Sequence, residues 1–239
     1  MSEIVFRSDV TVDLVRSQAS DSDVIFAARV STQGEKSKSA VGTDASDRDR
    51  GLINYLMRDR HGSPFEHNSF TFYVEAPIFV FREFMRHRIA SYNEESGRYR
   101  QMRPVFYVPG PERKLVQKGK PGAYDFYEGT PEQHELVTKA YKEQCESAFN
   151  AYLEMLDAGV AREVARGVLP LTLFSSMYVT VNARSMMNFL SLRTKREGSH
   201  FPSFPQREIE MVAEKIEEFF AEAMPLTYEA FNAGGRVAP

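Results

Sequence analysis

The spacing of hydrophobic and polar positions predicts a chain that mixes helices with strands. Runs of β-branched and aromatic residues favour strands, whereas apolar residues at helical spacing favour helices. We expect strands within residues 4–16 (on either side of Ser8-Asp9), 69–75, 98–108 and 173–181. We expect helices at residues 21–31, 46–60, 77–88, 131–158, 161–168, 183–196 and 206–223, with an aromatic strand as the alternative for 77–88. Because no repeat or sharp change in composition divides the chain, we expect a single α+β domain over residues 1–239.

The clearest predicted element is the helix over residues 131–158. Thr130 is a typical N-cap, Pro131 suits the first turn, and Gln133 completes a capping box. Gly159 follows the expected end of the helix. At about 1.5 Å per residue this helix would be roughly 40 Å long. We therefore expect it to cross the whole domain or to pack against a partner subunit.

Three segments lack apolar periodicity and are predicted to be loops. Residues 32–45 and 89–97 are polar, and residues 109–129 are rich in proline, glycine and lysine. The last segment is longer than most connections between elements, which favours a functional or mobile loop.

The composition excludes several classes of protein. The 239 residues are 42% hydrophobic and 26% charged, with a net charge of −3. Neither disorder nor a global attraction to nucleic acid or anionic membranes is therefore expected. No stretch approaches the about 20 apolar residues of a membrane helix, and the first residues lack the apolar core of a secretory signal. The single cysteine, Cys145, fits a reducing compartment, and we expect a cytoplasmic protein in which Cys145 serves in packing.

The sharpest local anomaly is a cluster of six arginines, accompanied by three acids. Its members are Arg82, Arg86, Arg88, Arg98, Arg100 and Arg103. Guanidinium groups grip phosphate oxygens in bidentate fashion, so the cluster fits a phosphate or another anion. A solvated network of internal ion pairs explains the same spacing equally well. If residues 77–88 are helical, Glu83, Arg86 and His87 share one face of that helix, and an extended segment from residue 98 would point Arg98 and Arg100 to the same side.

Other motifs carry less information. His61, Glu66 and His67 lack a standard metal-ligand spacing, and we expect no metal site. The chain contains neither a G-x-G-x-x-G motif nor a P-loop, so a Rossmann or NTPase nucleotide site is unsupported.

The arginine cluster contains a longer motif that points to a family. Residues 86–98 read Arg-His-Arg-Ile-Ala-Ser-Tyr-Asn-Glu-Glu-Ser-Gly-Arg. This segment resembles, at every specified position, the signature R-H-R-x-x-S-x-N-E-x-S-x-R of the flavin-dependent thymidylate synthases (ThyX family). Segments 61–67, 165–170, 182–184 and 192–193 are similar to family blocks in the same order, so the resemblance extends over roughly residues 20–225.

The resemblance implies an activity and its cofactors. Members of this family are methyltransferases of dTMP biosynthesis that convert dUMP to dTMP. They take a methylene group from methylenetetrahydrofolate and reducing equivalents from NADPH, both by way of bound FAD. The resemblance also implies a mainly antiparallel sheet flanked by helices, and a homotetramer whose subunits share active sites. The family uses no enzymatic nucleophile, which agrees with a single unremarkable cysteine.

The resemblance also assigns roles to individual residues. Arg193 matches the catalytic arginine that favours ionisation of uracil at N3, because a nearby cation stabilises the anion. Ser96 is assigned to hydrogen bonding, because no base adjoins it in the motif. Many relatives carry Gln at Glu83 and His at Asn188, so these two positions depart from the family pattern. The positions that match FAD contacts are Ser63, Arg86, His87, Arg88, Glu94, Asn182, Ala183, Arg184 and Asn188. The positions that match dUMP contacts are Glu83, Phe84, Met85, Arg86, Glu94, Glu95, Ser96, Gly97, Arg98, Arg166 and Arg193.

Two alternatives belong to other functional classes. One is a non-catalytic nucleic-acid module that stacks bases on Tyr92, Tyr99 and Tyr107, which the net charge of −3 disfavours. The other is a flavoenzyme that acts on a different nucleotide. Bound flavin separates the first alternative from an enzyme, and dUMP-dependent turnover separates the second.

Overall fold

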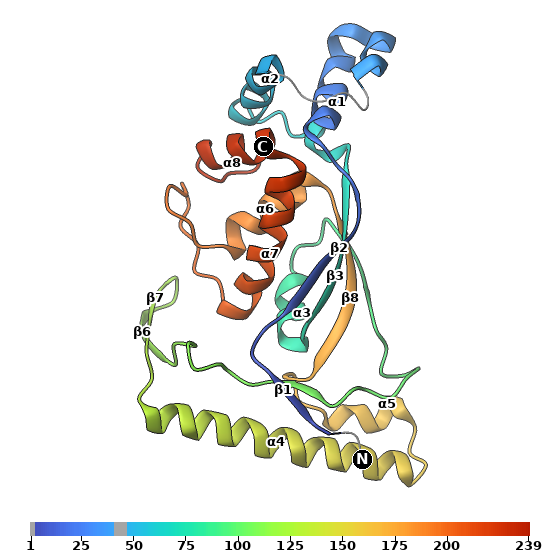
Figure 1. Cartoon of the computed structure of the whole chain (residues 1–239), viewed down its shortest axis with the longest axis vertical. Helices are drawn as coiled ribbons and strands as arrows, with labels where there is room; N and C mark the ends of the chain where they lie inside the picture. Colours follow the sequence, from blue (N-terminus) through green and yellow to red (C-terminus); the bar gives the residue numbers. More distant parts are fainter. Residues whose placement is uncertain (1–2, 41–46) are drawn as a thin grey trace. The chain divides into compact units, whose positions relative to one another are not determined.

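The computed structural model describes residues 3–40 and 47–239, in two compact units whose elements are labelled in Figure 1. The chain passes repeatedly from one unit to the other. Unit 1 comprises the residues up to Val10, Glu75–Phe84 and Glu94–Met177. Unit 2 comprises Thr11–Val74, Met85–Asn93 and Tyr178–Pro239. The expectation of one catalytic domain over residues 1–239 stays a prediction.

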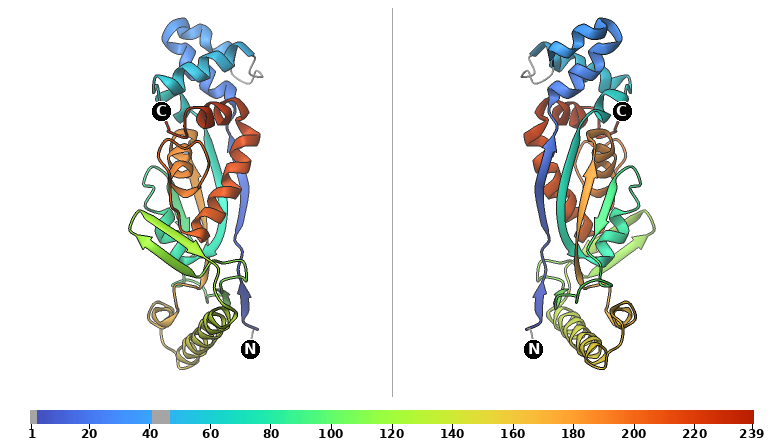
Figure 2. Two further views of the ribbon diagram at one scale, coloured as in Figure 1. Left: turned by 90° about the vertical axis from the view of Figure 1, so that its left-hand side faces the viewer. Right: turned by 90° about the vertical axis from the view of Figure 1, so that its right-hand side faces the viewer.

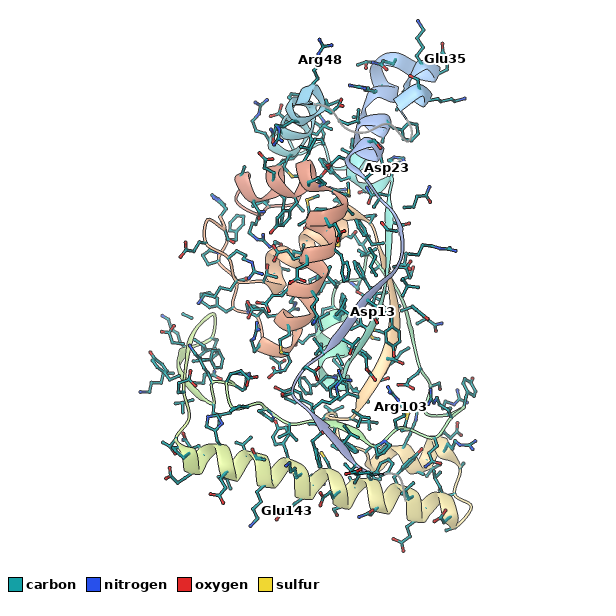
Figure 3. All side chains as sticks on the ribbon, viewed as in Figure 1. Asp13, Asp23, Glu35, Arg48, Arg103 and Glu143 are labelled. Carbon is teal, nitrogen blue, oxygen red and sulfur yellow. The ribbon has the colours of Figure 1, made fainter. Side chains whose placement is uncertain are left out.

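Unit 1 is organised around the long helix α4 (Pro131–Asp157), from which Glu143 projects away from the core of the unit (Figure 3). The parallel pair β1 (Val5–Arg7) and β5 (Val105–Tyr107) packs Phe106 against Phe149 of α4, edge to face with centroids 5.9 Å apart. The other elements are α3 (Ile78–Phe84), the antiparallel hairpin β6 (Val116–Lys120) and β7 (Ala123–Tyr127), α5 (Arg162–Ala165) and the 3-10 helix η3 (Arg166–Val168).

Cys145 lies in the core of unit 1, as predicted. Its thiol is 3.3 Å from the Thr172 hydroxyl, and burial raises the pKa of the thiol. A protonated, buried thiol is a packing group and not a nucleophile.

Unit 2 carries the remaining helices and much of the sheet. In Figure 2, helix α7 (Arg207–Ala223) lies along strand β2 (Thr11–Gln18), and the two elements are in contact. Helix α7 buries Ile209, Val212, Ile216 and Phe220 along one face. The remaining elements are α1 (Asp21–Gln33), η1 (Gly34–Ala40), α2 (Asp47–Arg58), η2 (Ser63–Glu66), α6 (Ala183–Arg193) and α8 (Pro225–Ala233).

The main sheet has the strand order β2-β3-β8-β4, with β3 (Ser69–Pro77), β8 (Phe174–Val181) and β4 (Ser91–Glu94). Phe70, Phe72 and Val74 of β3 are fully buried while the residues between them are partly exposed. This period of two is the pattern of a strand with one face in the core. The prediction of a mixed α+β chain with an antiparallel sheet is confirmed.

Five predictions of local structure were wrong. Helix α3 ends at Phe84, so Glu83, Arg86 and His87 do not share a helix face; the apolar positions that would pack a longer helix stop at Met85. Residues 98–100 form a turn in which Ser96 O accepts from the amides of Tyr99 and Arg100, not a strand.

The other three errors concern predicted loops. The 89–97 segment contains strand β4, which pairs with β8 at the edge of the main sheet. The 109–129 segment contains the β6–β7 hairpin, because Pro121 and Gly122 (φ 81°) form a tight turn between Lys120 and Ala123. The 32–45 segment begins with the end of α1 and continues as η1, and its residues 41–45 lie outside the described part of the chain.

Helix α4 begins with the predicted capping box. Thr130 Oγ1 accepts a hydrogen bond from the amide of Gln133 at 3.3 Å, and Gln133 Oε1 accepts one from the amide of Thr130 at 2.9 Å. Among the described residues, no helix combines the length and the apolar character needed to span a bilayer.

We expect Thr130→Ala to lower the free energy of unfolding by about 1 kcal/mol, because it leaves an amide of the first turn without its partner. Ser147→Ala, on the exposed face of the same helix, is the control and should be nearly neutral. Urea denaturation monitored by circular dichroism measures both changes. Equal losses in the two variants would mean that the cap contributes nothing specific.

Candidate active site

Helix α6 presents the predicted residues of unit 2. Asn182 is its N-cap and accepts a hydrogen bond from the amide of Ser185 at 2.9 Å, while Asn68 Oδ1 accepts one from the amide of Ala183 at 2.7 Å. The first turn of α6 is therefore anchored by two side-chain caps. Asn182 and Ala183 thus have structural roles besides the predicted one.

Arg184 ties α6 to two distant segments of unit 2. Its Nε donates to the Pro239 carbonyl oxygen at 2.6 Å, and its guanidinium pairs with Glu66 of η2. Any Cβ at Gly62 would collide with this guanidinium and with Pro239 O, so the close approach requires glycine. This contact places the predicted Ser63, at the start of η2, on the same side of unit 2 as α6.

The last residue of α6 makes the most informative contact. Arg193 Nε donates a hydrogen bond of 3.0 Å to His87 Nε2, and the edge of Phe189 packs on the imidazole with centroids 4.9 Å apart. A guanidinium can only donate, so Nε2 holds the lone pair and the neutral imidazole carries its proton on Nδ1. His87 thereby fixes the direction of the Arg193 side chain.

Burial, together with the nearby Arg193 charge, lowers the pKa of His87 from 6.5 to about 4. The environment of His87 is completed by Tyr92, whose hydroxyl donates to the His87 carbonyl oxygen at 2.7 Å. Burial raises the pKa of Tyr92 to about 12. At neutral pH both groups are uncharged, so Arg193 is the cation of this cluster.

We expect the NMR resonances of His87, assigned with His87→Gln, to show no titration between pH 8 and about pH 5. The unfolded chain takes up the proton near pH 6.5 and the folded chain near pH 4. The free energy of unfolding should therefore fall as the pH is lowered through this window. A His87 midpoint close to 6.5 would contradict the buried contact with Arg193.

The signature continues in unit 1 as a tight turn. The Glu95 amide donates to Ser176 O at 2.8 Å, and Glu95 Oε1 accepts from the Ser176 amide at 3.0 Å. Gly97 is buried, and a Cβ there would lie 3.0 Å from Met102 Sδ and 3.2 Å from Arg166 Cδ. The missing side chain of Gly97 lets Arg166 approach the turn.

The Glu94 carboxyl of this turn lies close enough to Arg166 for the two charges to interact. Burial raises the pKa of Glu94, the neighbouring Glu95 raises it further, and Ser175 and Arg166 oppose the shift. Arg98, by contrast, is exposed and pairs with Glu163 at 3.0 Å. An exposed pair of this kind contributes little to stability and can be exchanged for a ligand.

The six clustered arginines divide into those that pair with a carboxylate, namely Arg98, Arg100 and Arg103, and those without such a partner among the described residues. Arg103, labelled in Figure 3, joins Arg7 in clamping the buried Glu75 carboxylate. Burial alone would raise the pKa of Glu75, but the two arginines outweigh it and hold the pKa below its ordinary value. Arg103 is therefore part of an internal ion-pair network, as the alternative reading of the cluster expected.

Arg86 and Arg88 belong to the other group. Both side chains are exposed, and neither has an ion-pair partner within residues 3–40 and 47–239. Exposed guanidinium groups without a protein partner fit the diphosphate of a dinucleotide such as FAD. The donor set of this segment therefore suits the predicted flavin.

The predicted site residues thus form two groups, one within each unit. Unit 2 brings together His87 and Arg193, with Asn188 one turn earlier on α6, where its amide donates to the Arg184 carbonyl at 3.2 Å. Met85 is exposed in the same unit. Unit 1 holds Glu83 and the buried Phe84 of α3, the 94–98 turn and Arg166.

Two contributors were missed. Ser176 anchors the 94–98 turn through its backbone, and no sequence signal marks it. Phe189 packs on His87, and its position four residues before Arg193 on one helix face could have revealed it.

Comparison with known proteins agrees with these features. The family model described as thymidylate synthase complementing protein (Thy1) matches residues 13–226. A flavin-dependent thymidylate synthase of Streptomyces coelicolor is 66% identical over 238 residues, covering 99% of this chain and 96% of the relative. One from Tropheryma whipplei is 61% identical over 235 residues, covering 98% and 97%. The crystal structure of a UMP/dUMP methylase from Streptomyces cacaoi bound with 5-Br dUMP is similar with a TM-score of 0.92 and 54% identity, covering 99% of this chain and 100% of that one.

Proposed function

Since the chain belongs to the flavin-dependent thymidylate synthases, we propose that it converts dUMP to dTMP in the cytoplasm. The carbon donor is methylenetetrahydrofolate and the reductant is NADPH. Bound FAD supplies the redox chemistry that links them. The observation that carries the proposal is the cation Arg193 at the end of α6, which the neutral, half-buried His87 holds in place.

Arg193 acts on the uracil ring. A guanidinium beside N3 stabilises the anion that forms when the N3 proton leaves, and this raises electron density at C5. His87 Nε2 accepts a hydrogen bond from Arg193 Nε. This hydrogen bond fixes the direction in which the outer edge of the guanidinium points. C5 then forms a bond to the one-carbon unit and loses its hydrogen as a proton.

The phosphate of dUMP is assigned to the 94–98 turn and Arg166. Arg166 lies against Gly97, and the half-buried Glu94 beside it can accept from a hydroxyl or ring N–H of the nucleotide. Ser96 and Arg98 supply further donors. Glu83 and Phe84 lie on α3 of the same unit, and Met85 follows in sequence.

The residues that would hold FAD are those of unit 2. Arg86 and Arg88 match the phosphates of FAD. His87, which lies between them in sequence, and Asn188, on α6, add polar groups to this set. Ser63, with the Asn182–Arg184 segment, completes the set around η2 and the start of α6.

We also propose the homotetramer with shared active sites. Ile89 and Tyr99 flank the middle of the signature and are 76% and 79% exposed. Large apolar side chains at such exposure beside a binding motif favour burial by another subunit. Sedimentation at several protein concentrations measures the assembly, and a monomer at all concentrations would contradict it.

The proposed reaction is tested by complementation. Expression of the chain in a bacterial strain that lacks thymidylate synthase should permit growth without thymidine. Purified, FAD-loaded protein should form dTMP, detected by mass spectrometry, only when methylenetetrahydrofolate and NADPH are both present. Protein stripped of flavin should form none until FAD is restored.

A second candidate substrate is UMP. The neighbour from Streptomyces cacaoi is named a UMP/dUMP methylase and has also been solved with 5-Br UMP, with a TM-score of 0.90 and 53% identity. A competition reaction decides between the two substrates. It contains equimolar dUMP and UMP, and both methylated products are quantified. We expect dTMP to dominate, and an excess of the methylated ribonucleotide would reverse the assignment.

A further inference from the structure

Arg236 is a buried charge that the proposed reaction does not use. It follows α8, is 3% exposed and pairs with Glu217 of α7 at 2.7 Å. The same carboxylate pairs with Arg196 at 2.8 Å and accepts from the Tyr228 hydroxyl at 3.2 Å. Arg236 adopts a left-handed backbone conformation (φ 59°), which a non-glycine residue keeps only where its surroundings enforce it.

The second arm of the Arg236 guanidinium reaches the end of α6. Its Nη2 donates to Thr194 Oγ1 at 2.7 Å, and this hydroxyl donates in turn to the Leu190 carbonyl at 2.7 Å. The Thr194 amide also donates to Leu190 O, and the Thr194 carbonyl accepts from Ser203 Oγ at 2.6 Å. Thr194 is 1% exposed, so every polar group of this residue is buried and engaged.

Thr194 directly follows Arg193. The Arg193 backbone is therefore fixed from one side by Thr194, and its side chain is fixed from the other by His87 Nε2. A displacement of about 1 Å in a positioned group can cost about 10²-fold in rate. His87 and Thr194 thus both anchor Arg193, and of these two only His87 belongs to the signature.

On the basis of the proposed function, we propose that Arg236, held by Glu217, is a positioning residue that orients the catalytic Arg193 through Thr194. Because Arg236 is only 3% exposed, we assign it no direct contact with substrate or cofactor. Its planar fork spans the Glu217 carboxylate and the Thr194 hydroxyl at once, which a lysine ammonium cannot do with the same geometry.

The test separates positioning from stability with matched variants. Thr194→Val removes the hydroxyl that links Arg236 to α6 while keeping a β-branched side chain, and Thr194→Ser retains the hydroxyl. Thr227→Val is the control, because the Thr227 hydroxyl is equally buried and donates to Asp21 at 2.6 Å elsewhere in unit 2. Thr194→Val loses the hydrogen bonds of its hydroxyl to Arg236 and Leu190, and Thr227→Val loses the charge-assisted one to Asp21, so both variants should lower the melting temperature.

Of the two valine variants, only Thr194→Val should affect Arg193. We expect its kcat for dTMP formation to fall about 10²-fold with little change in KM for dUMP, whereas Thr194→Ser and Thr227→Val stay near wild type. In flavin-free protein, the NMR midpoint of His87 should rise in Thr194→Val and not in Thr227→Val, because the Arg193 charge leaves Nε2. Arg236→Lys should likewise lower kcat for dTMP formation and raise the NMR midpoint of His87.

The NMR readout does not depend on dUMP chemistry. If the wild type fails to methylate dUMP but Thr194→Val still shifts His87, the positioning contact stands and the proposed function fails. If Thr194→Val keeps wild-type kcat and an unchanged His87 midpoint, or if the Thr227→Val control loses as much activity as Thr194→Val, the positioning role is overturned.

Discussion

Arg193→Ala is expected to lower tritium release from [5-³H]dUMP by about 10³-fold while FAD stays bound. A single preorganised donor aimed at developing charge is worth about 10²–10³ in rate, and here the donor is also a full cation. The contact with His87 shows that Arg193 is held in one direction before any ligand binds. Flavin absorbance after gel filtration measures retention of the cofactor.

The control for Arg193→Ala is Lys195→Ala, which removes an exposed cation two residues away. This variant should release tritium at the wild-type rate. Arg193→Lys keeps the positive charge but not the planar guanidinium, and it should release tritium at a rate between those of Arg193→Ala and Lys195→Ala. Wild-type turnover in Arg193→Ala would remove Arg193 from the mechanism.

Arg166→Ala is expected to weaken dUMP binding by about 10²-fold, which corresponds to about 3 kcal/mol for one charge-assisted phosphate contact. Arg166 lies against Gly97, and its charge opposes the rise that burial causes in the pKa of Glu94, so it faces the 94–98 turn. Isothermal titration of flavin-loaded protein with dUMP measures the change.

Arg162→Ala is the matched control for Arg166→Ala. Arg162 lies one turn earlier, on α5, and is exposed. Its loss should leave the dUMP affinity unchanged. Equal weakening in both variants would indicate a general loss of positive charge and not a phosphate contact at Arg166.

The sequence predicted those elements whose signal is local. The start of helix α4 is specified by Thr130, Pro131 and Gln133. The buried face of α7 follows from the 3.6-residue period of its apolar residues. The end of α3 at Phe84 could not be predicted in the same way. The polar residues after it are compatible with a helix, and the structure instead holds His87 against Arg193 and Phe189 of α6, which lie far along the chain.

The site was predictable as a set of residues but not as contacts. The signature placed Arg86–Arg98 in one segment, yet it could not show that Arg103 belongs to the Glu75 clamp. The pairing of Arg193 with His87 joins residues 106 positions apart, and no local spacing encodes it. The Arg236 contact with Thr194 likewise depends on how α6, α7 and α8 pack within unit 2.

The most direct test of the central claim is tritium release from [5-³H]dUMP by the wild-type protein with methylenetetrahydrofolate, NADPH and FAD. Because a new bond at C5 expels the hydrogen of that carbon, we expect release in step with dTMP formation. Both should be lost in protein stripped of flavin and recovered on adding FAD. Absence of release from folded, flavin-loaded protein would contradict the thymidylate synthase assignment and favour a flavoenzyme that acts on another nucleotide.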